Sequence, residues 1–306
     1  MEYRKMMRIA VTGSSGLIGS ALVNHLRSLG HEVRRFVRRE PQAADEISWD
    51  PERKLIDVRT IEGLDGIIHL AGASIAARRW SRSYKQLIRS SRIDSTQLLV
   101  EALQKTASPP RFFLCASAIG YFGDRGEEVL TEASPRGTGF LATVVEEWEA
   151  TARYAEEYGV RVVNLRFGQV LARHGGVVAS LLPVFRLGLG GPIGQGLAWW
   201  SWILLEDVCR AVEFLLDHAE IRGPVNITSP NPVRNRDFTK AFAKAIHRPA
   251  VLRVPTLLLK LLFGQLAQEV LLASARVIPV RLQESGFSFA YADIDKAFAK
   301  IFETVL

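Results

Sequence analysis

The feature that most constrains this chain is a turn rich in glycine near its N-terminus. A short β-branched run at residues 8–11 leads into Thr-Gly-Ser-Ser-Gly-Leu-Ile-Gly at residues 12–19, and apolar residues at helical spacing follow at once. Glycines in such a turn permit a tight reversal, close approach of a pyrophosphate and close packing of helix on strand, while free N–H groups at the helix start face the anion. The strand before the turn and the helix after it favour a dinucleotide site over a merely structural turn. The residues predicted to bind the dinucleotide here are Gly13, Ser15, Gly16, Leu17, Ile18 and Gly19.

Strands and helices alternate along the first half of the chain. The pattern predicts strands at 32–37, 66–70, 111–116 and 160–165, and helices within 80–104 and at 140–158. This alternation indicates an α/β fold with a doubly wound parallel sheet of the Rossmann type. We expect a Rossmann domain at 8–170, its sheet completed by later segments, and a smaller C-terminal α/β lobe that carries the substrate side at 171–306.

The end of the second predicted strand indicates which dinucleotide is bound. NAD-binding sites carry an acidic residue there for the ribose 2′-hydroxyl, whereas this chain has Arg38 and Arg39. An arginine can hold a 2′-phosphate bidentately, which predicts NADP(H) as the cofactor. Two alternatives remain open at this point: the arginines are simply solvated, or Glu40 reaches the ribose.

Composition excludes several other classes of protein. The 306 residues are 48% hydrophobic and 23% charged, which is ordinary for a packed domain, and the net charge is +7. No nucleic-acid recognition motif accompanies the basic charge, so we expect no nucleic-acid partner. Cys115 and Cys209 lie in apolar stretches without metal-site spacing, which predicts buried free thiols, no metal and a cytoplasmic location. The apolar stretch 254–273 contains charges, so we expect an amphipathic helix pair and no membrane partner.

Motifs along nearly the whole chain resemble one family. They include residues 11–19, Ile-Ile-His-Leu-Ala-Gly-Ala at 67–73, the stretch 117–126, and Gly-Gly-Pro-Ile-Gly at 190–194. The sequence thereby resembles the extended, atypical short-chain dehydrogenase/reductases, in their nucleoside-diphosphate-sugar epimerase-like subfamily. The tail resembles that subfamily's C-terminal domain of unknown function, at about 252–302. The resemblance implies further cofactor contacts from Leu70, Ala71, Gly72 and Arg92.

The catalytic residues that this resemblance implies are only partly present. Ser117 follows a buried strand and Tyr121 lies four residues on, as in the family's Ser-x-x-x-Tyr stretch. The family's Tyr-x-x-x-Lys is missing, because Phe140 and Val144 occupy the aligned positions and none of the six tyrosines begins that motif.

Any chemistry therefore needs other proton carriers. We predict Ser117 and Tyr121 as catalytic, with Arg125 as a nearby cation and Glu132 as a nearby carboxylate. The alternatives are that Ser117 only hydrogen-bonds backbone groups at the end of its strand and that Tyr121 only packs at the edge of the cleft. We expect His69 to be a buried histidine whose ring nitrogens are hydrogen-bonded.

Residues later in the chain are expected to line the substrate side. They are Arg166, the glycine-rich stretch 188–196 and the tryptophans at 199, 200 and 202. Leu204 stands where the family usually has a histidine, so a polar contact is lost there.

Two functions follow from these observations. One is an NADP(H)-dependent oxidoreductase or sugar-nucleotide epimerase-like enzyme with an unusual proton donor, acting on a small molecule such as a nucleotide sugar. The other is a non-catalytic NADP(H)-binding sensor or scaffold protein. The oligomeric state stays open.

Overall fold

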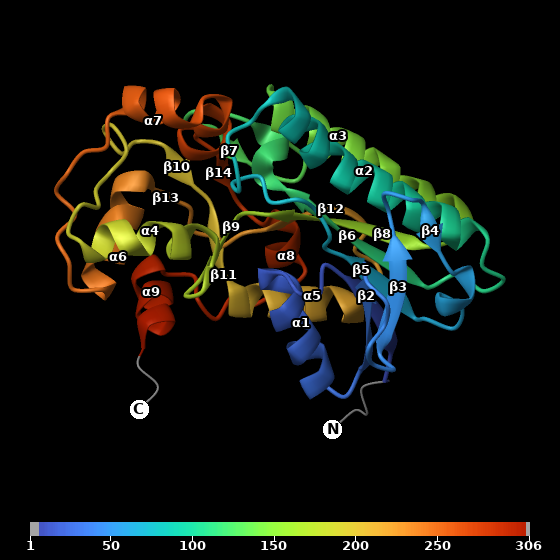
Figure 1. Ribbon diagram of the computed structural model, residues 1–306. Coiled ribbons are helices and arrows are strands. Elements are labelled where there is room, and N and C mark those ends of the chain that lie inside the picture. The colour runs from blue at the N-terminus through green and yellow to red at the C-terminus, as the bar shows by residue number, and fades with distance from the viewer. Residues whose placement is uncertain (1–5, 304–306) are drawn as a thin grey trace.

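A large, mostly parallel sheet forms the centre of the molecule (Figure 1). The computed structural model describes residues 6–303. Its eight-stranded sheet has the order β12-β8-β6-β5-β1-β2-β3-β4, in which only β4 pairs antiparallel to its neighbour. The strands of this sheet are β1 (Arg8–Thr12), β2 (Glu32–Val37), β3 (Glu46–Asp50), β4 (Leu55–Ile56), β5 (Gly66–His69), β6 (Phe112–Ala118), β8 (Arg161–Phe167) and β12 (Gly223–Ile227). The predicted doubly wound α/β fold is confirmed.

Helices cover both faces of the sheet. Helices α2 (Arg82–Gln104) and α3 (Phe140–Arg153) pack side by side on one face, and α1 (Leu17–Ser28) and α5 (Leu205–Asp217) lie together on the other (Figure 1). The β-strand period of two divides the central strands between the two cores. In β6, for example, Leu114 belongs to the core under α1 and α5, whereas Phe113 belongs to the core under α2 and α3.

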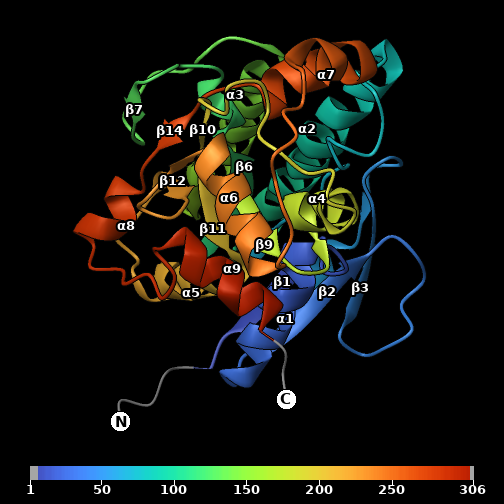
Figure 2. The same ribbon diagram turned by 90° about the vertical axis from the view of Figure 1, so that its left-hand side faces the viewer.

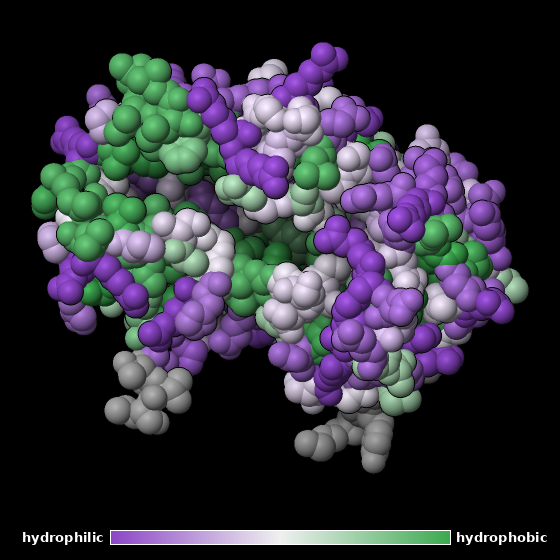
Figure 3. Space-filling model, viewed as in Figure 1, coloured by the Kyte–Doolittle hydropathy of each residue, from purple (hydrophilic) through white to green (hydrophobic). Residues whose placement is uncertain are grey.

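The second lobe has a separate core. Its helices are α4 (Gly176–Arg186), α6 (Asn235–Ala245) and α9 (Ile294–Phe302), and its short strands are β9 (Gln169–Ala172), β10 (Trp199–Trp200), β11 (Trp202–Leu204) and β13 (Val233–Arg234). Phe238, Phe242 and Phe298 fill this core as a cluster of rings. Figure 3 shows the molecule hollowed between this lobe and the part that carries α1. A cleft thus opens over the carboxyl ends of the strands.

The C-terminal segment returns to the first domain. Strand β14 (Arg276–Val277) pairs with β7 (Val129–Leu130), and α8 (Val280–Glu284) follows it. Before them lie α7 (Thr256–Phe263) and a π-helical turn, η4 (Ala267–Leu271), while 3-10 turns occupy η1 (Val58–Thr60), η2 (Ile119–Phe122) and η3 (Tyr154–Tyr158). Of the predicted amphipathic helix pair, the first helix forms as α7, which buries none of its residues, and the second is only the π-helical turn η4. In the described part of the chain no helix is long and apolar enough to cross a membrane.

Both cysteines are buried and free, as predicted. Burial raises the pKa of the Cys115 thiol, and burial raises that of Cys209 to about 12. Neither thiol is therefore reactive in the folded chain.

Candidate functional site

The glycine turn is built as a tight cradle. Gly13 adopts φ +65°, and a Cβ added there would lie 2.7 Å from the carbonyl of Leu70. A Cβ on Gly19 would lie 2.2 Å from the Gly13 oxygen, so α1 packs directly on the turn. No acidic residue and no side-chain cap occupy the start of α1. The first N–H groups of the helix therefore remain available to an anion.

A buried hydrogen-bond chain fixes the neighbouring loop to this cradle. The Thr12 hydroxyl accepts from the N–H groups of Leu70 and Ala71 at 3.0 and 3.1 Å, so its own proton points to His69 Nδ1 at 2.7 Å. The ring then carries its proton on Nε2, which donates to Ser95 at 3.2 Å. Burial, with a smaller contribution from Arg92, lowers the pKa of His69 to about 3. His69 is thus a neutral core histidine that joins the ends of β1 and β5.

Arg92 holds the same loop, residues 71–73, in place. Its guanidinium donates to the carbonyls of Ile88 and Ala73 at 2.9 and 3.1 Å and lies 5.3 Å from the ring of Trp148. Burial lowers the pKa of Arg92 to about 10, so it stays charged at neutral pH. Gly72 packs on it, since a Cβ there would lie 3.4 Å from the guanidinium carbon. Arg92 therefore positions the backbone of residues 71–73.

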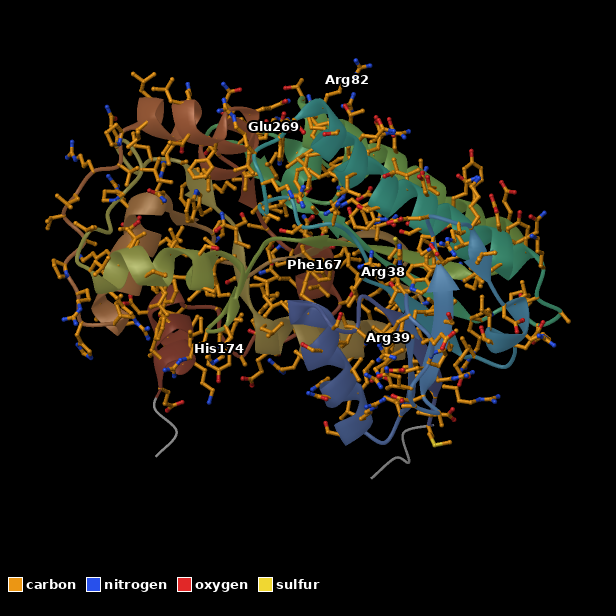
Figure 4. All side chains as sticks on the ribbon, in the orientation of Figure 1. Arg38, Arg39, Arg82, Phe167, His174 and Glu269 are labelled. Carbon is orange, nitrogen blue, oxygen red and sulfur yellow. The ribbon has the colours of Figure 1, made fainter. Side chains whose placement is uncertain are left out.

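The two arginines after β2 differ in their surroundings. Arg39 forms two hydrogen bonds to Glu46, at 2.7 and 2.8 Å, and also donates to the Glu40 carbonyl. That pairing lowers the pKa of Glu46. Arg38 is exposed and forms no hydrogen bond or ion pair with the described residues. Figure 4 shows Arg38 nearer the middle of the molecule, towards Phe167, and Arg39 farther from it. Arg38 is the one of the two whose guanidinium is available to a ligand.

A buried cluster joins the ends of β6 and β8 to α3. Ser117, only 3% exposed, donates to Glu149 at 2.6 Å. Arg166 donates to both oxygens of the same carboxylate, at 2.7 and 2.8 Å. The guanidinium of Arg166 also lies 3.6 Å from the ring centroid of Tyr121. The structure thus brings together both predicted catalytic residues, Ser117 and Tyr121, around an ion pair.

A cavity of about 360 Å³ opens beside this cluster. Tyr121, Glu132, Glu149 and Arg166 contribute to its wall. Two buried polar atoms, Arg166 Nη1 and Glu132 Oε2, have no hydrogen-bond partner in the described part of the chain. Burial raises the pKa of Glu132, although backbone N–H groups of Asn226 and Arg281 donate to its other oxygen. Both atoms are inaccessible to solvent, and polar groups buried in this way are normally hydrogen-bonded.

Arg125 does not accompany Tyr121 as predicted. Its guanidinium forms an ion pair with Glu128 at 2.6 and 2.8 Å and donates to the Pro135 carbonyl. The cation on the face of Tyr121 is Arg166, whose expected place was the substrate side of the cleft.

The residues in place of Tyr-x-x-x-Lys have no proton to give. Val144 is buried, and Phe140 begins α3 with its ring 5.3 Å from that of Trp80. The start of α3 is capped from far away in the sequence: Glu269 accepts from the N–H groups of Phe140 and Leu141 at 2.9 and 2.8 Å. The C-terminal segment thereby fixes the helix that borders the cleft.

Most of the predicted substrate-side aromatics belong to the core instead. Trp200, Trp202 and Leu204 are buried. Trp199 is half-buried and donates to Glu127 at 2.9 Å. The glycine-rich stretch packs on other backbone, because a Cβ on Gly191 would lie 1.5 Å from the Leu252 oxygen. Among the described residues, no cluster of side chains suits a metal ion.

Sequence reasoning missed Glu149 and Glu269. Glu149 shares the buried face of α3 with Val145, Trp148 and Ala152, and Arg166 lies within an apolar strand. A charged residue at a position where the pattern of apolar residues predicts burial indicates that it is paired with an opposite charge. Glu269 gives no such local signal, since its partners lie 128 and 129 residues away.

Comparison with known proteins places the chain among relatives of matching length. The NAD dependent epimerase/dehydratase family matches residues 9–228, and a domain of unknown function, DUF1731, matches residues 254–301. Epimerase family protein MT2273 of Mycobacterium tuberculosis is 42% identical over 94% of this chain and 95% of its own.

Two solved structures are also similar. The human epimerase family protein SDR39U1 (isoform 2), solved with NADPH, is 32% identical with a TM-score of 0.89, covering 98% of this chain and 100% of that one. The nucleoside-diphosphate sugar epimerase from Corynebacterium glutamicum is 35% identical with a TM-score of 0.82, covering 97% of this chain and 58% of that one. The resemblance drawn from the motifs is thus confirmed: the chain belongs to the NAD-dependent epimerase/dehydratase family and carries the DUF1731 domain at its C-terminal end.

Proposed function

We propose that the chain binds NADP(H) and transfers hydride to or from a small polar substrate, with a nucleotide sugar as the substrate class. The observation that carries the cofactor choice is Arg38, exposed and without a partner among the described residues at the end of β2. The cradle at Gly13 and the uncapped start of α1 suit a pyrophosphate. The NADPH in the human SDR39U1 structure supports the same choice.

The bound nicotinamide supplies the hydride chemistry, and this chain's residues handle the proton. In the oxidising direction a substrate alcohol must lose its proton as hydride leaves. Ser117 donates its only proton to Glu149, so its oxygen is left to accept one from the substrate. The proton of the alcohol passes to Ser117 while the Ser117 proton passes to Glu149. Arg166 holds the carboxylate in place through both oxygens.

Tyr121 is the second proton-bearing group of the proposal. Its ring lies against Arg166 and borders the cavity, so its hydroxyl is a candidate to orient or protonate the substrate oxygen. The charged residues Arg166 and Glu132, which line the same cavity, suit a ligand with several hydroxyl groups, such as a sugar. Five further residues surround the proposed dinucleotide and act on it through their backbone or their charge: Arg39, Leu70, Ala71, Gly72 and Arg92.

The test combines binding and turnover. NADPH affinity is measured by quenching of tryptophan fluorescence, and turnover by nicotinamide absorbance with UDP-glucose, UDP-N-acetylglucosamine and UDP-glucuronic acid as probes. Ser117→Ala and Tyr121→Phe are each expected to abolish turnover and to leave the affinity for NADPH within about twofold, because neither contacts the phosphate cradle. Loss of NADPH binding in these variants would show that their roles are misassigned.

One observation favours the second function, a non-catalytic NADP(H) sensor or scaffold. Phe140 packs on Trp80 and Val144 is buried, so the usual catalytic positions serve packing alone. Tight NADPH binding with no turnover of any probe, and with no hydride exchange between NADPH and a nicotinamide analogue, would select this function.

A further inference from the structure

An exposed apolar face lies on the second lobe, away from the cleft floor. We define it by six side chains from α7 and two neighbouring loops: Leu187, Val251, Leu257, Leu258, Leu261 and Leu262. Val251 is 77% exposed, and Leu257 and Leu261, one turn apart on α7, are 68% and 65% exposed. Figure 3 shows hydrophobic surface over α7 and along the same side of the lobe, and Figure 2 shows α7 at the opposite end of the molecule from α1. Contiguous exposed apolar surface of this kind marks a binding site.

The pieces of this face are held together by backbone. The N–H of Val254 donates to Pro192, and that of Gly194 donates to Val254, each at 2.9 Å. The loop after Leu187 therefore runs beside the segment that carries Val251, and α7 begins directly after that segment. The two segments that carry the six side chains are thus neighbours in the fold.

The two stretches of sequence that form the face carry charge of one sign only. No aspartate or glutamate occurs at residues 158–205 or 238–268, the two stretches that form it. Seven exposed cations lie in those stretches, and four of them stand within three residues in sequence of the side chains that define the face: Arg186, Arg248, Arg253 and Lys260. Beside the face, Arg186 and Arg248 line an open cavity of about 320 Å³ whose other described wall residues are Ala245, Ile246 and Phe302. The two guanidinium groups suit the phosphate of a lipid, and the apolar side chains around them suit its acyl region.

We propose that this face binds the surface of a bilayer that contains anionic lipids, with α7 lying in the interface. Exposed leucines with lysine or arginine among them are the features of helices that bind in this way. A second copy of the chain is a poorer occupant, because an isologous contact would bring the same cationic patch of both copies together. The expectation of no membrane partner came from the missing spanning segment, and a surface contact needs none.

The test is co-sedimentation of the full chain with vesicles of phosphatidylcholine alone or mixed with phosphatidylglycerol. We expect binding to the mixed vesicles only, weakened by salt. Each cation near an anionic surface contributes about fivefold to binding, so Arg253→Gln with Lys260→Gln lowers the partition coefficient about 25-fold. Leu257→Asp with Leu261→Asp abolishes binding. Leu55→Asp, at an equally apolar and 57% exposed position on β4, leaves it unchanged.

Circular dichroism and the thermal midpoint establish that each variant is folded, and sedimentation velocity measures its oligomeric state. Failure of the folded wild-type chain to bind mixed vesicles at low salt overturns the proposal. So does equal binding by the Leu257/Leu261 variant. A wild-type dimer that this variant converts to monomer, without vesicle binding, assigns the face to self-association instead.

Discussion

Breaking the buried pair of Glu149 and Arg166 is expected to destabilise the fold strongly. Both side chains are nearly inaccessible, at 5% exposure for Glu149 and 3% for Arg166, so either one left alone is a desolvated charge. Removing one partner of such a pair costs about 3–5 kcal/mol. That is a large part of the roughly 5–15 kcal/mol by which domains are stable. Glu149→Leu and Arg166→Met are each expected to lower the free energy of unfolding by this amount.

The double variant, Glu149→Leu with Arg166→Met, distinguishes a coupled ion pair from two side chains that stabilise the fold independently. With both charges replaced by apolar side chains of similar volume, the cost falls below that of either single change, because no charge remains unpaired. Ser117→Ala leaves the carboxylate with Arg166 and removes one hydrogen bond to a charged group, so we expect a loss of about 1.5–3 kcal/mol. Urea unfolding followed by circular dichroism measures all four variants. Single losses below about 1 kcal/mol, or a double loss equal to the sum of the singles, would refute this reasoning.

Two further predictions concern the cradle. Gly13→Ala is expected to abolish NADPH binding and to destabilise the chain, because the new Cβ meets the Leu70 carbonyl. The control is Gly126→Ala, which is also at positive φ but has nothing within 4 Å of the new Cβ. This control is expected to add only about 1–2 kcal/mol of backbone strain. Equal effects in fluorescence titration and urea unfolding would contradict the steric account. His69 has a folded pKa of about 3, below its unfolded value near 6.5, so the unfolded chain takes up the proton first as pH falls. Its contribution to stability is present above pH 6.5 and lost below it, about 2 kcal/mol between pH 7 and pH 5. His69→Gln should remove that part of the pH dependence in denaturant unfolding, and an unchanged slope would show that the ring titrates normally.

The local pattern of hydrophobic residues and turn residues predicted the elements that surround the glycine cradle. Residues 32–37 form β2 as predicted, and the predicted strand at 66–70 is β5 with its end one residue earlier. Both are short strands, β5 fully buried and β2 buried at Val33 and Phe36, and their hydrophobic residues and flanking turns are adjacent in sequence. Strand β3 was not predicted, because its five residues stand between polar, proline-containing stretches and are recognisable as a strand only through pairing with β2.

The contacts that define the site depend on distant residues and were harder to predict. Ser117 meets Glu149 across 32 residues, and Glu269 caps α3 from 129 residues away. Only the folded sheet brings these partners together. The two arginines after β2 looked equivalent in sequence, and the parallel neighbour β3 distinguishes them by placing Glu46 beside Arg39. The pattern at 254–273 predicted a helix that forms as α7, but it could not show that this helix buries none of its residues.

The central claim is that this chain selects NADP(H) through Arg38. Its most direct test is a fluorescence titration of the wild-type chain, Arg38→Ala and Arg39→Ala with NADPH and with NADH. The wild-type chain should bind NADPH with micromolar or tighter affinity and NADH much more weakly. Arg38→Ala should weaken NADPH binding about 10- to 100-fold, the loss of a charge-assisted hydrogen bond, and leave NADH unchanged, while Arg39→Ala has a smaller effect. Equal affinity of the wild-type chain for both nucleotides, or no effect of Arg38→Ala, would contradict the account.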